Sequence, residues 1–293
     1  MQYIGYLFFR LLKISFSLIP FCLLYIYSDI LYFFLFHVFG YRKKVVYSNL
    51  KRSFPEKSEQ EIHRIAKDFY TNLSDITLES IKGLSMSKKA LQKRYPVLNV
   101  DLLDEYLVNN KSVIGLASHY TNWEWGVLSF GFQFKHKSIG LYKPLSNKYI
   151  DSYIKKTRAA WGMNLVSIKN TSDAFNEKHE KPAVYFMVSD QSPSNRKKAI
   201  WVKFLNQDTA CLHGAEAYAK KYDLPLVYGD IQRVKRGYYN VTISIIEENP
   251  KQTKEGEITQ KYMKKLEDTV LAKPENWLWS HKRWKHKREN NES

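Results

Sequence analysis

The chain has 293 residues, 44% of them hydrophobic, and its formal net charge is +17. This length and composition suit one large domain, or one domain with an anchor, and the excess of cations implies a polyanionic partner such as nucleic acid, anionic lipid or an acidic carrier protein. Two cysteines, Cys22 and Cys211, exclude a disulfide-rich scaffold, and a bond between them is not expected because Cys22 lies in an apolar segment.

The N-terminal segment is apolar over a length that suggests attachment to a membrane. No charged residue occurs in 14–28 or in 30–40, and Asp29 separates these two runs. Each run is shorter than the roughly 20 residues that span a bilayer, and Pro20 interrupts the first. Together they predict one tilted, kinked span or a shallow hairpin in one leaflet, with a pair of aromatic-rich core helices as the alternative. We therefore expect residues 1–41 to form a membrane anchor.

A long helix is expected after the anchor. Ser58 is suited to cap its N-terminus, and Glu61, three residues further on, completes a capping box. Apolar residues then recur at steps of three and four, at Ile62, Ile65, Phe69, Leu73 and Ile76. This spacing places them on one face of a helix that runs to about Ile81, and we expect that face to pack on the core. A shorter helix is expected at 101–108.

Beyond residue 112, strand-like and helix-like segments alternate. Strands are expected at 113–117, 139–142, 165–168 and 183–188, with a hairpin formed by 226–232 and 239–246 around Arg236-Gly237. Helices are expected at 123–132, at 148–161, near Ser172, at 215–222 and at 257–271. This alternation predicts an α/β domain with a mixed central sheet flanked by helices over residues 42–288, followed by a disordered tail at 289–293.

Several polar side chains directly follow the predicted strands. His119 and Glu124 come after the first strand, Lys143 after the second and Asp190 after the fourth. The sites of open α/β sheets gather beyond strand ends. Neutral imidazole accepts a proton near pH 7, and a carboxylate beside it fixes its tautomer and stabilises the imidazolium, which suits activation of a hydroxyl for acyl transfer. We therefore expect His119 to be a base that Glu124 orients.

Motifs for other chemistries are missing from the sequence. The histidines show no His-x3-His spacing and there is no Cys-x2-Cys, so we expect no metal site. No phosphate-binding loop, no dinucleotide fingerprint and no Gly-x-Ser-x-Gly elbow occurs either. We expect no cofactor, and a direct transfer from donor to hydroxyl without a covalent enzyme intermediate.

Basic residues form three clusters, at 196–198, at 233–236 and at 282–288. Tryptophans interleave with or precede the last cluster, at Trp277, Trp279 and Trp284. A nucleic-acid surface, a lipid headgroup surface and a solvated basic tail all have this composition. Because the N-terminus is so apolar, we favour contact with lipid and expect no binding of nucleic acid.

Four ordered segments resemble the bacterial late lipid A acyltransferases, within the lysophospholipid acyltransferase superfamily. They are His119-Tyr120-Thr121-Asn122-Trp123-Glu124; Tyr142-Lys143-Pro144-Leu145 with Asn147 and Arg158; Asp190-Gln191 with Val202-Lys203-Phe204 and Gly214-Ala215; and Pro274 with Trp277 to Lys285. Upstream, Asn49-Leu50 and Phe54-Pro55 are also similar to the family, so the likeness covers about residues 41–288. Two positions depart from it, since Lys143 replaces the usual arginine and Thr121 stands where glycine is frequent.

The resemblance implies a glycerolphosphate-acyltransferase-like fold and an acyl carrier protein as donor. His119 would deprotonate a hydroxyl on a lipid A precursor while Glu124 holds the imidazole. Backbone amides near Asn122, with Lys143 or Arg158, would stabilise the oxyanion. Asp190 would orient one of these cations. Such an enzyme is expected at the bacterial inner (cytoplasmic) membrane, with its catalytic domain facing the cytoplasm.

Alternatives remain open at this stage. The same chemistry could act on a lysophospholipid, an aminolipid or a pigment lipid, or the protein could bind lipid without catalysis. A membrane-tethered nucleic-acid binder would account for the charge but not for the His119–Glu124 spacing. The sequence does not fix the acyl length, the donor as carrier protein or coenzyme A, the form of the anchor or the oligomeric state.

Overall fold

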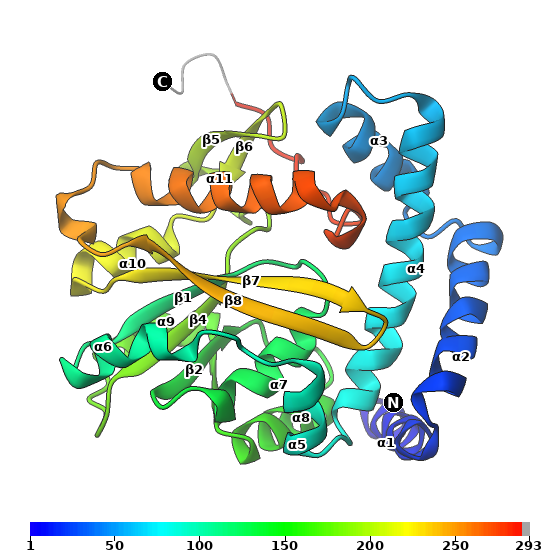
Figure 1. Ribbon diagram of the computed structural model, residues 1–293, viewed down its shortest axis with the longest axis horizontal. Coiled ribbons are helices and arrows are strands. Elements are labelled where there is room, and N and C mark those ends of the chain that lie inside the picture. Colours follow the sequence, from blue (N-terminus) through cyan, green and yellow to red (C-terminus); the bar gives the residue numbers. More distant parts are fainter. Residues whose placement is uncertain (289–293) are drawn as a thin grey trace.

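The computed structural model describes residues 1–288, and the tail expected at 289–293 lies outside the described residues. A six-stranded sheet forms its centre, with strand order β3-β2-β4-β1-β7-β8 (Figure 1). The strands are β1 (Val113–Ala117), β2 (Lys137–Tyr142), β3 (Met163–Ser167), β4 (Ala183–Val188), β7 (Leu226–Lys235) and β8 (Tyr238–Glu247). The first five run parallel, and β8 is antiparallel to β7. The predicted α/β class with a mixed sheet is confirmed.

Helices cover both faces of this sheet and stand beside its end (Figure 1). They are α3 (Lys43–Ser53), α4 (Glu59–Gly83), α5 (Lys88–Arg94), α6 (Asp104–Val108), α7 (Trp123–Gln133), α8 (Lys148–Ala160), α9 (Thr171–Asn176), α10 (Gly214–Tyr222) and α11 (Glu257–Ala272). In Figure 1, α10 and α11 lie on one side of the sheet, α5 and α7 on the other, and α3 and α4 beside its end. With helices on both sides, β1 is buried at every position, which is why its sequence is apolar throughout instead of alternating.

The long helix α4 begins where its capping signal predicts. Ser58 accepts a hydrogen bond from the backbone N–H of Glu61, and the Glu61 carboxylate accepts one from the backbone N–H of Ser58 at 2.9 Å. The apolar positions expected on one face are buried, except for the partly buried Leu73. Helices α3 and α5 were not expected from the sequence.

A second sheet of two strands was also not expected. It consists of β5 (Ile200–Phe204) and β6 (Gln207–Cys211), which pair antiparallel. Their turn residues, Leu205 and Asn206, have φ of +48° and +64°. Tight hairpin turns of this kind usually contain glycine, so the sequence lacks the usual turn signal.

This small hairpin helps to enclose the C-terminal segment. Trp277 and Trp279 are buried in the main core, and Arg283 is only 1% exposed. Arg283 donates hydrogen bonds to the Ala210 carbonyl at 2.6 Å and to the sulfur of Cys211 at 3.1 Å. The interpretation of this segment as a lipid headgroup surface is therefore wrong for these three side chains. The alternation of tryptophan and cation along the chain does not show which of these side chains other segments cover.

The N-terminal segment forms two helices that break at Pro20. They are α1 (Gln2–Leu18) and α2 (Phe21–Phe33), and the latter continues into a π-helical turn at Phe34–Val38. No residue of α1 is buried. Phe21–Val38 is the one stretch in residues 1–288 that is long and apolar enough to cross a membrane, by length and composition only, and 17% of it is buried.

Helix α2 packs along α4 (Figure 1) and is joined to it by polar contacts. The buried Asp75 of α4 accepts hydrogen bonds from Ser28 of α2 at 2.6 Å and from Arg233 and Arg236 of the β7–β8 hairpin. Arg236 also pairs with Asp29. Asp29, the one acid within the apolar N-terminal segment, is therefore neutralised by an arginine of the domain.

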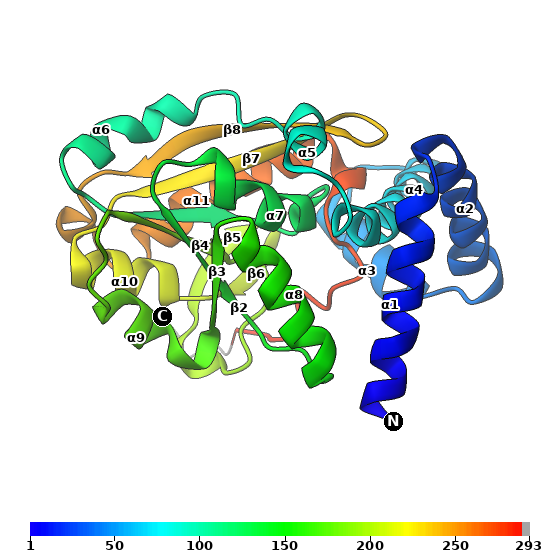
Figure 2. The same ribbon diagram turned by 90° about the horizontal axis from the view of Figure 1, so that it is seen from below.

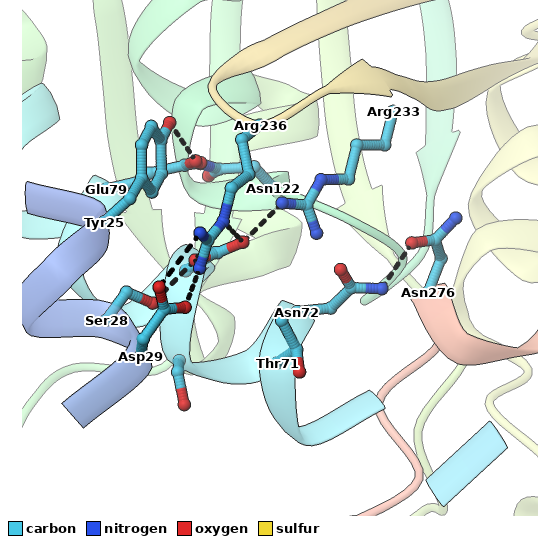
Figure 3. A network of polar contacts seen from close by, with 12 residues as sticks. Tyr25, Ser28, Asp29, Thr71, Asn72, Glu79, Asn122, Arg233, Arg236 and Asn276 are labelled. Carbon is cyan, nitrogen blue, oxygen red and sulfur yellow. Dashed lines mark hydrogen bonds and ion pairs between the residues drawn. The ribbon is translucent and has the colours of Figure 1, made fainter. Parts of the chain in front are cut away.

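A second buried acid of α4, Glu79, joins four elements, and Figure 3 shows it with Tyr25 and Asn122. The carboxylate of Glu79 accepts hydrogen bonds from Tyr25 of α2 at 2.8 Å, from Asn122 at 2.7 Å and from Tyr239 of β8 at 2.7 Å. The Glu79 carbonyl also accepts a bond from the Trp125 indole of α7 at 2.8 Å. Burial raises the pKa of Glu79, and the hydrogen bond from Tyr239 opposes that rise. Glu79 thus connects the N-terminal helices to the start of α7.

Replacing Glu79 with alanine should destabilise the protein, because three buried donors lose their acceptor. We expect Glu79→Ala to lower the free energy of unfolding by about 2–4 kcal/mol, measured by urea denaturation in mild detergent. Glu180→Ala removes an exposed carboxylate and should change it by less than about 0.5 kcal/mol. Equal effects of the two substitutions would contradict this account of the buried carboxylate.

Candidate active site

The register of the two central strands brings His119 and Asp190 together. Ala117, the last residue of β1, pairs with Val188, the last residue of β4, in a parallel arrangement. His119 and Asp190 each lie two residues beyond these ends, so they leave the sheet at the same edge. The Asp190 Oδ1 lies 2.7 Å from the His119 Nδ1, and Oδ2 accepts the backbone N–H of His119 at 3.0 Å.

Asp190 is buried and fully engaged as an acceptor. Besides the two bonds from His119, it accepts the indole N–H of Trp277 at 2.9 Å. Trp277 comes from the C-terminal segment, whose backbone also bonds the His119 loop, since the Leu278 N–H donates to the His119 carbonyl at 3.1 Å. The carboxylate is therefore fixed by donors from two distant parts of the chain.

The charges of this pair shift both of its pKa values. Burial alone would lower the pKa of His119, but the charge and hydrogen bond of Asp190, with a contribution from the charge of Glu124, raise it above its usual value. Burial would raise the pKa of Asp190, but the charge of His119 and the donated hydrogen bonds lower it. The pairing makes His119 a stronger base and keeps Asp190 ionised.

The other ring nitrogen of His119, Nε2, is not bonded to the Asp190 carboxylate. In the neutral imidazole, Nδ1–H donates to Asp190, which leaves the Nε2 lone pair free to accept. The Gln191 amide nitrogen lies 3.1 Å from Nε2, and the Trp123 ring packs edge-on at 5.1 Å between centroids. The His119 side chain is 20% exposed, so Nε2 can be reached by a hydroxyl that displaces the Gln191 amide.

Glu124 does not hold the imidazole, contrary to the prediction. It lies in the first turn of α7, and its carboxylate accepts a bond from the Arg158 guanidinium of α8 at 2.5 Å. Asp190 takes the position next to the ring because β4 neighbours β1 in the sheet. Asp190 was expected to orient Lys143 or Arg158, but the side chain that it orients is His119. The structure thus corrects two predictions about which groups are paired.

Arg158 is well placed to interact with a negative charge near His119. Its side chain is 12% exposed, and one of its terminal nitrogens bonds Glu124. Its buried Nε has no hydrogen-bond partner within residues 1–288. A buried N–H without an acceptor is costly, so this nitrogen calls for an explanation.

Asn122 shapes the turn between β1 and α7 through two side-chain hydrogen bonds. Its side-chain oxygen accepts the Trp125 N–H at 3.0 Å and so caps α7, and its amide donates to Glu79. Thr121 before it has φ of +50°, a left-handed conformation in which glycine is favoured, and its N–H donates to the Asn276 carbonyl at 2.8 Å. Thr121 therefore adopts the left-handed backbone conformation that glycine, the residue frequent here in the family, would adopt easily.

Lys143 lies at the same edge of the sheet but further away along it. It follows β2, which β4 separates from β1, and its side chain is exposed. Within residues 1–288 it forms no ion pair. The structure therefore brings His119, Asp190, Glu124 and Arg158 together and leaves Lys143 outside this group.

Over residues 1–288, no three His, Cys, Asp or Glu side chains gather closely enough to hold a metal ion.

Some residues of the site had no site role in the sequence analysis. Trp277 contacts Asp190 and Trp123 contacts His119, although Trp277 is far away in sequence. The adjacent Gln191 approaches the reactive nitrogen. No periodicity or spacing signals such contacts, since each depends on how separate segments meet beyond the sheet.

Comparison with known proteins identifies the family of this chain. The sequence model of the bacterial lipid A biosynthesis acyltransferases matches residues 2–286. A lipid A biosynthesis lauroyltransferase of Escherichia coli (strain K12) is 24% identical over 250 residues, which are 83% of this chain and 79% of the relative. A lipid A biosynthesis palmitoleoyltransferase of the same strain and a lipid A biosynthesis acyltransferase of Shigella flexneri are each 20% identical over 245 residues, with the same shares. The chain belongs to the bacterial lipid A biosynthesis acyltransferases.

Proposed function

We propose that the protein moves a fatty acyl chain from the thioester of an acyl carrier protein to a hydroxyl of a lipid A precursor, with His119 as general base. The observation that carries the mechanism is the His119–Asp190 pair, with Nδ1 held at 2.7 Å and with Nε2 beside only a neutral group, the Gln191 amide at 3.1 Å. Family membership supports an acyltransferase that acts on lipid A. The net charge of +17 suits both an acidic carrier and an anionic acceptor.

The proposed reaction needs one base and no cofactor. His119 Nε2 accepts the proton of the acceptor hydroxyl while its oxygen attacks the thioester carbonyl carbon. The tetrahedral intermediate collapses, the carbon–sulfur bond breaks, and the imidazolium returns the proton to the leaving thiolate. Asp190 stabilises the imidazolium between these two proton transfers. The products are the acylated lipid and the free carrier thiol.

Stabilisation of the tetrahedral oxyanion is assigned to Arg158 and to the N-terminus of α7. The Arg158 guanidinium, which Glu124 holds in place, can stabilise the negative charge of the oxyanion. The first N–H groups of α7, next to Asn122, have no acceptor within their own helix. Glu124 is thus proposed to act in two ways: it positions Arg158, and its negative charge near His119 favours the imidazolium. The exposed Lys143 is proposed to contact an anionic substrate group.

The N-terminal helices are proposed to attach the enzyme to the bacterial inner membrane, with the catalytic domain in the cytoplasm. Apolar side chains are exposed along α1 at Ile4, Leu7, Phe8, Leu11, Ile14 and Leu18. Others are exposed along α2 and the turn after it, at Leu23, Ile26, Ile30, Phe33, Phe34 and Val38. Exposed apolar surface of this extent suits contact with lipid. In this proposal residues 1–41 are the anchor and 42–288 the acyltransferase domain.

Loss of the base should abolish transfer without removing the protein from the membrane. We expect His119→Ala to lower the rate of acyl transfer by at least about 10³-fold, while the protein stays folded and membrane-associated. The readout is mass spectrometry of lipid A from cells that lack the gene and express each variant, which also reveals the acyl length. His63→Ala changes an exposed histidine of α4 and should restore the missing chain. Restoration by His119→Ala would exclude the mechanism.

The pH dependence of the rate should report the His119–Asp190 pair. Activity is expected to rise with pH as the imidazolium loses its proton, with a midpoint above about 6.5 because Asp190 raises the pKa of His119. Asp190→Asn removes that charge, so the rise should move to lower pH, and the plateau should fall by about 10²–10⁴-fold because the tautomer is no longer fixed. Asp173→Asn, at an exposed aspartate, is the control. If the activity of Asp190→Asn rises at the same pH as that of the wild type, Asp190 does not determine the pKa of the catalytic base.

A further inference from the structure

Helices α1 and α8 lie side by side (Figure 2). Their side chains line a groove. Aromatic rings join them, with centroids 5.4 Å apart for Tyr3 and Tyr149 and 5.7 Å apart for Phe9 and Tyr153. The groove has a volume of about 720 Å³. It is therefore a hollow between two packed helices and is large enough for a sugar-sized group.

The charged side chains that line the groove are all positive. Arg10, Lys148 and Lys156 line it, and no acid does. Within residues 1–288 none of these three cations forms an ion pair. Arg10 donates to the Tyr6 hydroxyl at 2.9 Å and lies 5.3 Å above the Tyr153 ring, so its contacts are with neutral groups.

The acid nearest to these cations along α8 points elsewhere. The Asp151 carboxylate accepts the Tyr142 hydroxyl at 2.9 Å and the Leu145 N–H at 2.8 Å. It is therefore engaged with β2 and the loop that follows. The cations of the groove are left without a counter-charge from the protein.

Both ends of α1 are fixed to the domain, so the groove is part of the folded structure. At the C-terminal end, Lys82 of α4 donates to the carbonyls of Phe16, Ser17 and Ile19 at 2.8–3.0 Å. At the N-terminal end, the Asn147 amide donates to the Gln2 carbonyl at 2.8 Å. Such contacts hold the cations of α1 and α8 at a defined separation.

The groove adjoins the apolar surface of α1 and shares α8 with the reactive site. Apolar side chains of α1 such as Leu7, Phe8 and Leu11 are exposed and belong to the proposed membrane surface. Helix α8 also bears Arg158, two residues after Lys156, which bonds Glu124 beside His119. One helix thus connects the groove to the site of transfer.

We infer that this groove binds a phosphate of the lipid acceptor, an inference that rests on the proposed function. A guanidinium, two ammonium groups and tyrosine hydroxyls are suitable donors for a phosphate dianion. The volume exceeds the needs of a single phosphate and accommodates the sugar that bears it. Phosphate held here would place a hydroxylated acyl chain of the same lipid toward His119. A bulk phospholipid headgroup is the competing occupant.

The test compares two triple variants in purified full-length protein. One carries Arg10→Ala, Lys148→Ala and Lys156→Ala. The control carries Arg64→Ala, Lys89→Ala and Lys178→Ala, which removes the same charge at exposed positions without ion pairs within residues 1–288. Transfer is measured in detergent micelles with a phosphorylated lipid A precursor, and with the same precursor after phosphatase treatment.

We expect the groove variant to raise KM for the phosphorylated acceptor about tenfold or more, with kcat and KM for the acyl donor changed less than about twofold. On the dephosphorylated acceptor, the wild type, the groove variant and the control should behave alike. An unchanged KM for the phosphorylated acceptor would overturn the inference. Weaker binding of the groove variant to vesicles that contain phosphatidylglycerol, with that KM unchanged, would assign the groove to bulk lipid.

A binding measurement separates this inference from the proposed function. Equilibrium binding of the phosphorylated precursor to the wild type and both variants requires no catalysis. If the wild type fails to acylate the precursor but binds it in a groove-dependent manner, the proposed function fails and the phosphate site stands. If binding is equal in all three proteins, the phosphate site fails whatever the activity.

Discussion

The pairing of His119 with Asp190 is the interaction on which the rest of the site depends. Strands β1 and β4 are in parallel register, so residues two positions beyond their ends meet at one edge of the sheet. The resulting contact fixes the imidazole through Nδ1 and exposes Nε2. The Trp277 indole also donates to this carboxylate and helps to fix it. A buried, ionised carboxylate in this position raises the basicity of the ring without taking part in bond formation.

Helix α4 connects this site to the N-terminal helices through two buried acids. Asp75 binds Ser28 of α2 and the arginines of the β7–β8 hairpin, and Glu79 binds Tyr25 of α2 together with Asn122 at the start of α7. Gly237 at the hairpin tip has φ of +70°, and a Cβ there would lie 2.2 Å from the Tyr25 hydroxyl, so only glycine allows this close approach. The proposed membrane side and the reactive edge of the sheet are thereby held in one fixed relation.

Local features of the sequence predicted much of the fold. The capping box at Ser58, the buried run of β1 and the turn at Gly237 each depend on near neighbours in the chain, and the structure has all three. The set of strand-end side chains was also predictable. Which of them touch was not, because that depends on strand order: β4 neighbours β1 and supplies Asp190, whereas Glu124 turns toward Arg158. The C-terminal tryptophans were misinterpreted for the same reason, since only distant segments such as β5 and β6 show that they are covered.

Nuclear magnetic resonance of the His119 ring, labelled with ¹⁵N in the full-length protein in detergent, tests the central claim most directly. We predict a neutral ring with its proton on Nδ1 and a pKa above that of a free histidine. In Glu124→Gln the Nδ1 proton should stay hydrogen-bonded, and the pKa of His119 should fall only slightly. In Asp190→Asn the pKa of His119 should fall further, and the chemical shift of the Nδ1 proton should lose the displacement that the hydrogen bond causes. Loss of that displacement in Glu124→Gln, with retention in Asp190→Asn, would contradict the account.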